Sequence, residues 1–404
     1  MITLEKKEHL LKVCKEFVDV SKIVEISELK GGHINESYLI TMPEVEYTLQ
    51  KINTHVFRSP YGMMHNIQEV TDFIRKKIVY TGLNPQRGVL NIVLTRYDQT
   101  LAIIEDEYWR CTQFINNATA YERLDDPEMF YEMGRIVGDF QGLLDGFHTR
   151  ILEDTIPHFH DTAYRYNHFL QIVKLDSCDR VKEVKEEIAK IKYFSPCFSY
   201  VNKLIEDKEI PRRVTHNDTK PSNVLFDSKT KRAICLIDLD TVMKGSILFD
   251  YGDALRGGAS TANEDEKDLS KVTVDLRMVE AFTKGMLTEM KGIITPKEVA
   301  NLFYAYALMT MELGMRFLDD YLDGDKYFKT SYPTHNLDRA KNQLKLFDEI
   351  ISKRKEIFDI INNIVIELGF DKEFRFVDKH PSGFLNDKFP TGFKGWLNYS
   401  FVLK

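Results

Sequence analysis

The segment VTHNDTKPSNVLF, residues 214–226, constrains the fold of this chain more than any other stretch. It sets the polar side chains His216, Asp218 and Asn223 between apolar runs, and a second apolar run, AICLID, follows after a short turn. Two such strands joined by a turn form a hairpin, which brings Asp238, at the end of the second strand, back beside Asn223. A surface loop explains any one of these residues alone, but the combination indicates a catalytic loop.

The composition is that of an ordinary globular chain. Of the 404 residues, 43% are hydrophobic and 29% are charged, which is enough for two or three lobes with sizeable cores. The net charge is −7 and Lys and Arg do not cluster, so a nucleic-acid interface is not indicated. The five cysteines are scattered without a C-x-x-C spacing, which argues against a disulfide framework and against zinc.

The sequence also argues against membrane contact. No apolar run approaches the roughly 18 residues that a membrane-spanning helix needs. The N-terminal stretch MITLEKKEHLLKVCKEFVDV has the pattern of an amphipathic helix with charges throughout, unlike a signal peptide. We therefore expect a cytoplasmic protein.

Apolar periodicity divides the chain into a β-rich part and a helical part. Strand-like alternation dominates the first third, and helical spacing dominates later. We expect strands at 22–29, 91–96, 100–106 and 108–115, a hairpin turning at Pro43 and Glu44, and helices at 59–82, 125–147, 180–194, 264–290, 296–321 and 336–369. The fold class is therefore α+β, with a small β-rich N-terminal lobe (1–116), a larger mainly helical C-terminal lobe (117–369) and a tail (370–404) of no assigned role.

The polar constellation fits the needs of phosphoryl transfer from ATP. Mg²⁺ takes only one or two carboxylates from the protein, and a further carboxylate orients the attacking hydroxyl. Protein kinases meet these needs with H-R-D-x-x-x-x-N, followed by an Asp at the end of a short strand. Here the steps from His216 to Asp218 and on to Asn223 are the same, and Asp238 ends the next apolar run.

Longer motifs resemble a family of small-molecule kinases. THNDTKPSNVLFD and CLIDLDTV resemble the H-x-D-x-x-x-x-N and I-D-x-[DE] motifs of the aminoglycoside phosphotransferase and choline kinase superfamily. FDYGDALRGGASTANEDE, with GGHINESYLI and LQKIN upstream, resembles the N-acetylhexosamine 1-kinase family, whose members phosphorylate the anomeric hydroxyl of N-acetylglucosamine and N-acetylgalactosamine. The resemblance extends from Lys22 to Gly369 and implies a bilobal protein-kinase-like fold that uses ATP and Mg²⁺.

The resemblance implies a role for each polar residue of the loop and hairpin. Asp218 contacts the acceptor hydroxyl and takes its proton, while Asn223 and Asp238 bind Mg²⁺. A carboxylate with an ordinary pKa of about 3.9 is a weak base, so Asp218 mainly orients the hydroxyl in a loose transition state. Asp240 is a weaker metal candidate, because a structural carboxylate explains it equally well, and His216 braces the loop.

For the nucleotide, the resemblance implies a lysine, a glutamate and a hinge. Lys51 in YTLQKIN corresponds to the lysine that pairs with ATP phosphates, and Glu69 on the following helix is its expected partner. For both residues the ordinary alternative is a solvated surface side chain. Backbone groups from Gln113 to Ile115 are expected to read the adenine edge.

The acceptor pocket is expected to contain four residues: His33, Arg256, Arg316 and Tyr327. Both arginines lie among small or apolar residues, where a guanidinium needs partners. Arg316 and Tyr327 are assigned by the resemblance. The alternatives are turn stabilisation for His33 and an internal ion pair for Arg316 with Asp319 or Asp320.

Three interpretations remain. The leading one is an ATP- and Mg²⁺-dependent N-acetylhexosamine 1-kinase, a monomer or weak homodimer acting on a small amino sugar without nucleic-acid or membrane partners. The second is another kinase of the superfamily, acting on a different sugar, an aminoglycoside or a choline-like alcohol. Gly257, where relatives are expected to carry a larger side chain, keeps this second interpretation open. The third is a nucleotide-binding pseudokinase. Such a protein would be expected to lose Asp218, Asn223, Asp238 or Lys51, and this chain retains all four.

Overall fold

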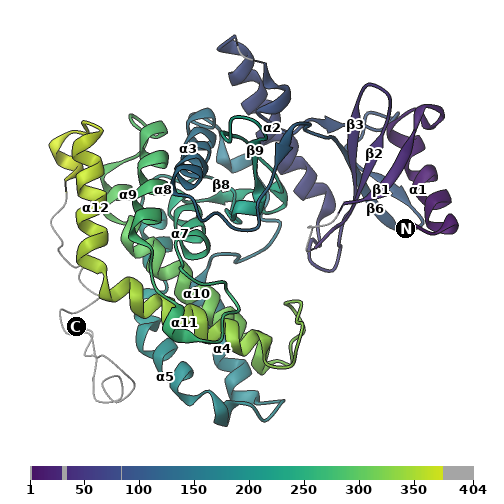
Figure 1. Ribbon diagram of the computed structural model, residues 1–404. Helices are drawn as coiled ribbons and strands as arrows, with labels where there is room; N and C mark the ends of the chain where they lie inside the picture. The colour runs from purple at the N-terminus through teal and green to yellow at the C-terminus, as the bar shows by residue number, and fades with distance from the viewer. Residues whose placement is uncertain (1, 30–33, 83, 376–404) are drawn as a thin grey trace. The chain divides into compact units, whose positions relative to one another are not determined.

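The computed structural model describes residues 2–29, 34–82 and 84–375, and Figure 1 shows its ribbon. It confirms the α+β class, because a β-rich N-terminal region is followed by a larger helical portion. The described strands are β1 (Glu25–Glu28), β2 (Glu36–Thr41), β3 (Glu46–Lys51), β4 (Ile92–Val93), β5 (Ala102–Ile104), β6 (Glu107–Gln113), β7 (Ala118–Thr119), β8 (Arg213–Thr215), β9 (Val224–Asp227), β10 (Ala233–Leu236) and β11 (Met243–Gly245). The described α-helices are α1 (Leu4–Phe17), α2 (Pro60–Tyr80), α3 (Pro127–Leu143), α4 (Thr162–Leu175), α5 (Lys185–Phe194), α6 (Tyr200–Glu206), α7 (Ile247–Gly258), α8 (Leu276–Glu289), α9 (Pro296–Ala300), α10 (Leu302–Leu322), α11 (His335–Ser352) and α12 (Arg354–Glu367).

The chain forms two compact units, each assembled from separate stretches of sequence. Unit 1 comprises Met1–Glu122, Asp139–Pro157 and Ser222–Lys244. Unit 2 comprises Arg123–Gly138, His158–Pro221 and the described part of Gly245–Lys404. The first stretch of unit 1 ends close to the lobe boundary expected at 116–117, but the hairpin that carries Asp238 belongs to unit 1 and not to the helical unit.

The main sheet of unit 1 has six strands in the order β1-β2-β3-β6-β4, with β5 also paired to β6. Helix α1 covers one of its faces (Figure 1). The core beneath α1 combines helix and strand side chains, among them Leu10, Val13, Tyr38, Ile40, Leu49 and Trp109. Because strand side chains alternate between faces, the neighbours Gln50 and Arg110 point to the face opposite α1.

The predicted hairpin after the catalytic loop is confirmed as β9 and β10. Their register pairs Leu236 with Val224, and the Ile237 amide donates to the Asn223 carbonyl at 2.9 Å. Val224, Phe226 and Cys235 are fully buried. The apolar strands therefore fix the polar residues at their ends on a rigid element.

Helix α10 forms the centre of unit 2, where it packs against α4, α7 and α11. Of its 21 residues, all are buried except Arg316 and Asp319. Helix α7 approaches α10 closely at Gly252, where an added Cβ would lie 2.4 Å from the carbonyl oxygen of Ala305. The close approach requires glycine at this position.

Several of the expected helices differ from the structure. The helix expected over 180–194 begins at Lys185, the one expected over 296–321 is divided into α9 and α10, and the one expected over 336–369 is divided into α11 and α12. The largest difference is at α8. The pattern predicted helix over 264–290, but α8 begins at Leu276, after Asp275 accepts a hydrogen bond from the Arg277 amide. The preceding stretch instead forms turns, in which Asp268 accepts from the Ser270 amide. Asp and Ser side chains compete with helical hydrogen bonds in this way, so helical spacing alone was misleading.

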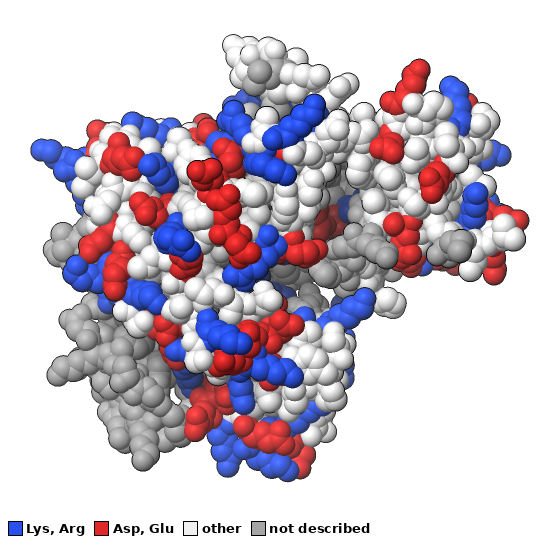
Figure 2. All heavy atoms as spheres, viewed as in Figure 1, with Lys and Arg blue, Asp and Glu red and all other residues white. Residues whose placement is uncertain are grey.

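No helix in the described part of the chain is both long enough and apolar enough to cross a membrane. On the face drawn in Figure 2, acidic and basic side chains are interspersed, as on an ordinary solvated surface.

Candidate active site

The catalytic loop of unit 2 is held by one buried carboxylate at the start of α7. Asp250 accepts hydrogen bonds from the backbone amides of His216 at 3.0 Å and Asn217 at 2.7 Å. Its carbonyl oxygen accepts from the Thr219 hydroxyl at 2.6 Å. His216 is fully buried, and its Nδ1 accepts from the Asp218 amide at 3.3 Å. The brace expected of His216 is thus present, and Asp250 provides a second one.

Asp250 itself is in an unfavourable place for a charge. Burial raises the pKa of its carboxyl to about 6, although His216 and the two amides favour the ionised form. Burial is therefore the dominant cause, because the hydrogen bonds offset only part of the desolvation. The loop conformation depends on a carboxyl that titrates near neutral pH.

Asp218 has a cationic neighbour that the sequence interpretation missed. Lys220 Nζ donates to Asp218 Oδ2 at 2.8 Å, and the two side chains are 33% and 29% exposed. The carboxylate is thus accessible to an acceptor, and a cation stands beside it, where a transferred phosphoryl group would need charge stabilisation. The signal was the lysine two residues after Asp218 in the motif itself.

The two predicted metal ligands lie at adjacent ends of the hairpin in unit 1. Asn223 ends a short 3₁₀ turn before β9, and Asp238 follows β10. Asp238 is exposed and adopts a left-handed conformation, with φ of 59°. One carboxylate and one amide fit Mg²⁺, which keeps several waters and substrate oxygens among its ligands. The described residues contain no group of three or more His, Cys, Asp and Glu that could hold a metal by themselves.

Asp240 anchors the end of the hairpin to the main sheet. Its carboxylate accepts hydrogen bonds from Arg110 on β6 and, at 2.7 Å, from the Asn35 side chain. Arg110 Nε also donates to Gln50 on β3 at 2.9 Å, and Gln50 donates to Ser37 on β2 at 2.9 Å. These contacts are those of a structural carboxylate, which was the alternative to a role for Asp240 as a metal ligand.

The assignment of Lys51 to ATP phosphates needs correction. Lys51 shares a strand face with Leu49, which is the face that α1 covers. Its ammonium pairs with Glu107 at 2.5 Å and Glu36 at 3.5 Å, and Glu107 also contacts His9 of α1 at 2.9 Å. Lys51 therefore belongs to a charged cluster on the α1 side of the sheet.

The expected pair between Lys51 and Glu69 is absent from the described residues. Glu69 lies half-buried on α2, and α2 contacts the turn that carries Asp240, on the face of Arg110. Successive residues of a strand point to opposite faces of the sheet. Lys51 points to the face that α1 covers, and α2 lies on the other face, so Lys51 does not contact α2.

The expected hinge follows β6 directly. The amide of Gln113 donates to the Asn91 carbonyl at 2.8 Å, and that of Phe114 to the Glu46 carbonyl at 2.8 Å. Within the described part of the chain, neither the amide nor the carbonyl of Ile115 has a hydrogen-bond partner. Ile115 thus retains the backbone groups that adenine recognition needs, whereas the amide of Gln113 is already bonded.

Arg256 is held inside unit 2 and does not line the acceptor pocket described next. Its guanidinium pairs with Asp253 at 2.8 Å and with Glu264 at 2.9 Å. Burial opposes its charge, yet these carboxylates and the nearby Asp218 raise the pKa of Arg256. Its position is that of a structural cation close to the catalytic loop.

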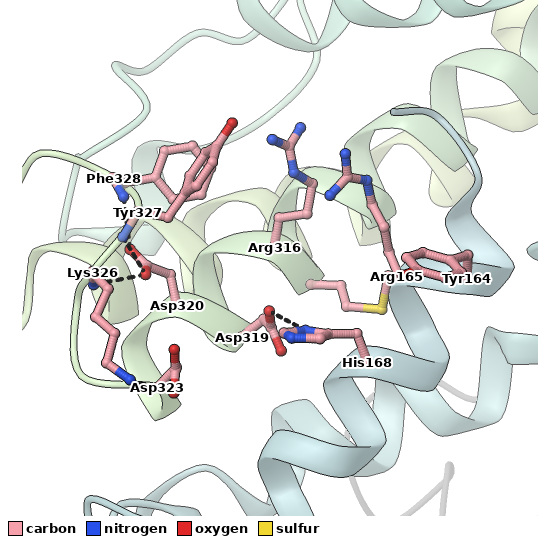
Figure 3. A pocket seen from close by; sticks show the side chains of 11 residues that line it. Tyr164, Arg165, His168, Arg316, Asp319, Asp320, Asp323, Lys326, Tyr327 and Phe328 are labelled. Atoms are coloured by element: carbon pink, nitrogen blue, oxygen red, sulfur yellow. Dashed lines mark hydrogen bonds and ion pairs between the residues drawn. The ribbon is translucent and has the colours of Figure 1, made fainter. Parts of the chain in front are cut away.

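Arg316 and Tyr327 do come together, in a pocket of about 400 Å³ between α4, α10 and the segment after α10 (Figure 3). The Arg316 guanidinium lies 5.5 Å from the ring centre of Phe159, 5.8 Å from that of Tyr327 and 5.5 Å from that of Phe328. The predicted alternative, an ion pair with Asp319 or Asp320, does not form. The rings of Phe159, Tyr327 and Phe328 thus form an aromatic cage, and the guanidinium of Arg316 occupies it.

The carboxylates of this pocket are already bonded. Asp319 contacts His168 at 3.0 Å, and Asp323 contacts Lys326 at 2.9 Å. Asp320 accepts hydrogen bonds from consecutive backbone amides, those of Lys326, Tyr327 and Phe328. Burial raises the pKa of Asp319 to about 6, with His168 acting against it.

Glu312, which lies 4.0 Å from the pocket residue Arg165, is connected to the catalytic loop. Glu312 Oε1 contacts His160 at 2.9 Å, and His160 lies 3.4 Å from the carbonyl of Asn217, which precedes Asp218. A chain of buried contacts within unit 2 therefore runs from Arg165 to the catalytic loop.

With this geometry in place, comparison with known proteins is decisive for the family. Residues 25–270, more than half of the chain, match the phosphotransferase enzyme family (APH). The chain belongs to the phosphotransferase enzyme family. This phosphotransferase therefore carries its catalytic loop, its hairpin and α7 inside the matched region, whereas the pocket residues on α10 lie beyond it.

Solved structures support the same fold for this phosphotransferase. An aminoglycoside phosphotransferase from Alicyclobacillus acidocaldarius is 15% identical, with a TM-score of 0.56 over 84% of this chain and 95% of its own. An ethanolamine kinase from Plasmodium vivax is 12% identical, with a TM-score of 0.53 over 86% and 89%. A spectinomycin phosphotransferase in complex with ADP and spectinomycin is 13% identical, with a TM-score of 0.51 over 86% and 98%. These identities establish the fold alone.

One predicted acceptor residue of this phosphotransferase, His33, lies outside the described residues, as does the tail from residue 376 onward.

Proposed function

We propose that this phosphotransferase transfers the γ-phosphoryl group of ATP to the anomeric hydroxyl of an N-acetylhexosamine, such as N-acetylglucosamine or N-acetylgalactosamine. The observation that carries the choice of acceptor is the cage around Arg316. The structural neighbours are named for acceptors that carry amines, namely aminoglycosides and ethanolamine. An aromatic cage attracts such cations, but here a guanidinium already occupies it, which favours a non-cationic acceptor.

The roles proposed for the catalytic loop follow from its contacts. Asp218 orients the anomeric hydroxyl and takes its proton late in a loose transition state, where a weak base suffices. The anomeric hydroxyl is more acidic than other sugar hydroxyls because the ring oxygen withdraws electrons. Lys220, which pairs with Asp218, offsets charge on the transferred phosphoryl group.

The nucleotide and metal are assigned to unit 1. Asn223 and Asp238 would hold Mg²⁺, which neutralises phosphate charge when bound. In place of Lys51, we assign the phosphate-binding cation to Arg110, because it lies on the sheet face toward Asp240. Arg110 Nη2 has no partner among the described residues, so it retains donors for a phosphate oxygen. Ile115 would read the adenine edge.

The acceptor is tested by incubating the protein with Mg-ATP and single acceptors while ADP is followed. N-acetylglucosamine and N-acetylgalactosamine are expected to stimulate ADP release, whereas choline, ethanolamine and an aminoglycoside are not. Stimulation by an amine and by no sugar contradicts the proposal.

The role of Asp218 has its own test. Asp218→Asn should lower kcat by about 10²–10⁴-fold, the range for loss of a general base, and leave ATP affinity within about twofold. Calorimetry of ATP binding provides the control. A variant that loses ATP binding would instead assign Asp218 a structural role.

A further inference from the structure

The acceptor pocket contains a second arginine beside Arg316. Arg165 lies on α4 and Arg316 on α10, and Figure 3 shows both guanidinium groups turned to the same side, away from Asp319 and Asp323. Two adjacent guanidinium groups repel each other. Burial, together with the charge of Arg316, lowers the pKa of Arg165 to about 10.

Few protein groups satisfy these two arginines. Arg165 donates its Nε to the Phe159 carbonyl at 2.6 Å and lies 4.0 Å from Glu312. Arg316 contacts only aromatic rings, and in the described part of the chain it has no hydrogen bond and no ion pair. The terminal nitrogens of both side chains therefore have donors to offer a ligand.

Few carboxylates lie close to the two guanidinium groups. Among the described residues, Glu312 is the one carboxylate within 4.0 Å of either guanidinium, and its oxygens already accept from His160 and Thr162. Although burial acts against ionisation, His160 and the arginines lower the pKa of Glu312 to about 2, so it is ionised. Asp319, which is beyond ion-pair distance, also favours the charged form of Arg165. The other pocket carboxylates are bonded to partners of their own.

We propose that Arg165 and Arg316 bind an anionic group, a carboxylate or a phosphate, on the acceptor molecule. Guanidinium groups match the planar or forked oxygens of such groups with paired hydrogen bonds. The rings of Tyr327 and Phe328 lie beside Arg316 and offer an apolar surface for the remainder of the ligand.

This inference rests on the proposed function in taking the pocket as the acceptor site. It extends the proposed acceptor class from neutral N-acetylhexosamines to amino sugars, or related sugars, that carry one acidic substituent. Glu312, which faces Arg165, is linked through His160 to the loop of Asp218. A pocket of about 400 Å³ is within the range that holds a small ligand.

The test compares two pairs of probes that differ in charge, by calorimetry of the full chain without nucleotide. One pair is glucose and glucuronate, which tests a carboxylate. The other is N-acetylglucosamine and its 6-phosphate, which tests a phosphate. In at least one pair the charged member should bind about tenfold or more tightly than the neutral member, as expected for hydrogen bonds to a charged group.

Arginine variants then test whether Arg165 and Arg316 cause the preference for the charged probe. Arg316→Gln and Arg165→Gln should each remove most of the preference for the charged probe, and Arg316→Lys should retain part of it. Arg277→Gln, which removes an exposed arginine paired with Asp275, is the matched control and should leave the preference unchanged. Thermal unfolding confirms that each variant is folded, and Arg316→Lys remains informative if Arg316→Gln does not fold.

The outcomes separate this inference from the proposed function. Equal binding of charged and neutral probes, or equal weakening of both by Arg316→Gln, overturns the anion site even if N-acetylglucosamine is phosphorylated. Tight, arginine-dependent binding of a charged probe supports the anion site even if no N-acetylhexosamine is turned over.

Discussion

At the scale of single residues, Arg110 and Lys51 show that the face of the sheet to which a side chain points determines its contacts. Both are cations in the same sheet, and Lys51 is paired in register with Trp109, the residue before Arg110. Lys51 faces α1 and is held by two glutamates, whereas Arg110 is 5% exposed and bonded to Asp240. Only the second cation lies near the hairpin that ends in Asp238.

Exchange of either cation for glutamine should separate the two roles. Arg110→Gln should weaken binding of Mg-ADP by about tenfold or more, since a hydrogen bond to a charged phosphate is lost. Lys51→Gln should change it by less than about twofold. Calorimetry on folded protein measures both. Arg110→Gln should also lower the free energy of unfolding by about 3 kcal/mol, because Asp240 loses its buried partner. Strong weakening by Lys51→Gln alone would restore the original assignment.

The hairpin pattern predicted Asn223 beside Asp238, and the structure brings them together. The family resemblance placed Arg316 and Tyr327 in one pocket, and the structure has both there. The resemblance misplaced Lys51 because the alternation in YTLQKIN is too short to reveal which face α1 would cover. The sequence indicated that Asp250 braces the catalytic core, but no local pattern shows which backbone amides it binds. These contacts join residues far apart in sequence, and their energetics depend on burial.

The raised pKa of Asp250 predicts a pH dependence of stability. Between about pH 4 and 6 the folded protein holds a proton that the unfolded chain has released, so this contribution to stability is present below about pH 4 and is lost as the pH rises through 6. The free energy of unfolding should fall by about 2–3 kcal/mol over this range relative to Asp250→Asn.

Urea unfolding from pH 4 to 7 measures the difference, with the exposed Asp98→Asn as control. Parallel pH profiles for the wild type and Asp250→Asn would show that Asp250 does not titrate in this range.

At the scale of elements, α7 joins the catalytic loop to the core. Its first turn carries Asp250, and its middle packs on α10 at Gly252. Its last turn carries Gly257, where an added Cβ would meet nothing within 4 Å. Gly257 is not among the residues that line the pocket around Arg316, so a larger side chain at this position would not narrow that pocket.

The two glycines of α7 should respond oppositely to alanine. Gly252→Ala forces a methyl group against the Ala305 carbonyl and should lower the free energy of unfolding by about 1–3 kcal/mol. Gly257→Ala removes a flexible helix position and should raise it by up to about 1 kcal/mol. Urea unfolding measures both. A stability loss at Gly257 equal to that at Gly252 would contradict the packing described for α7.

Periodicity predicted most elements well, because β2, β3, α2 and the β9–β10 hairpin have uninterrupted patterns between clear turn signals. It was wrong at the start of α8. There, Asp and Ser side chains capture backbone amides that helical spacing alone would assign to a helix.

At the scale of the whole molecule, sequence order and spatial unit do not coincide. The chain leaves unit 1 and returns to it twice, and the second return delivers Asn223 and Asp238. A boundary drawn once along the sequence could not represent this, because composition changes only gradually where the chain passes between units.

Nucleotide binding should therefore stabilise the protein in a Mg²⁺-dependent way. At a hundredfold excess over Kd, Mg-ADP should raise the free energy of unfolding by about 2.7 kcal/mol. Chelation with EDTA should reduce this gain, and Asp238→Ala should abolish the difference made by Mg²⁺. Thermal unfolding with and without EDTA measures it. A gain in Asp238→Ala that still depends fully on Mg²⁺ would remove Asp238 from the metal site.

The guanidinium of Arg316 among three rings has a consequence for how acceptor classes diverge. The rings of Phe159, Tyr327 and Phe328 form the kind of enclosure that attracts quaternary and primary ammonium groups once it is empty. Arg316→Ala would empty it without altering the ring residues themselves. The loss of this one side chain would therefore leave three rings around a space whose shape and polarity suit an ammonium group.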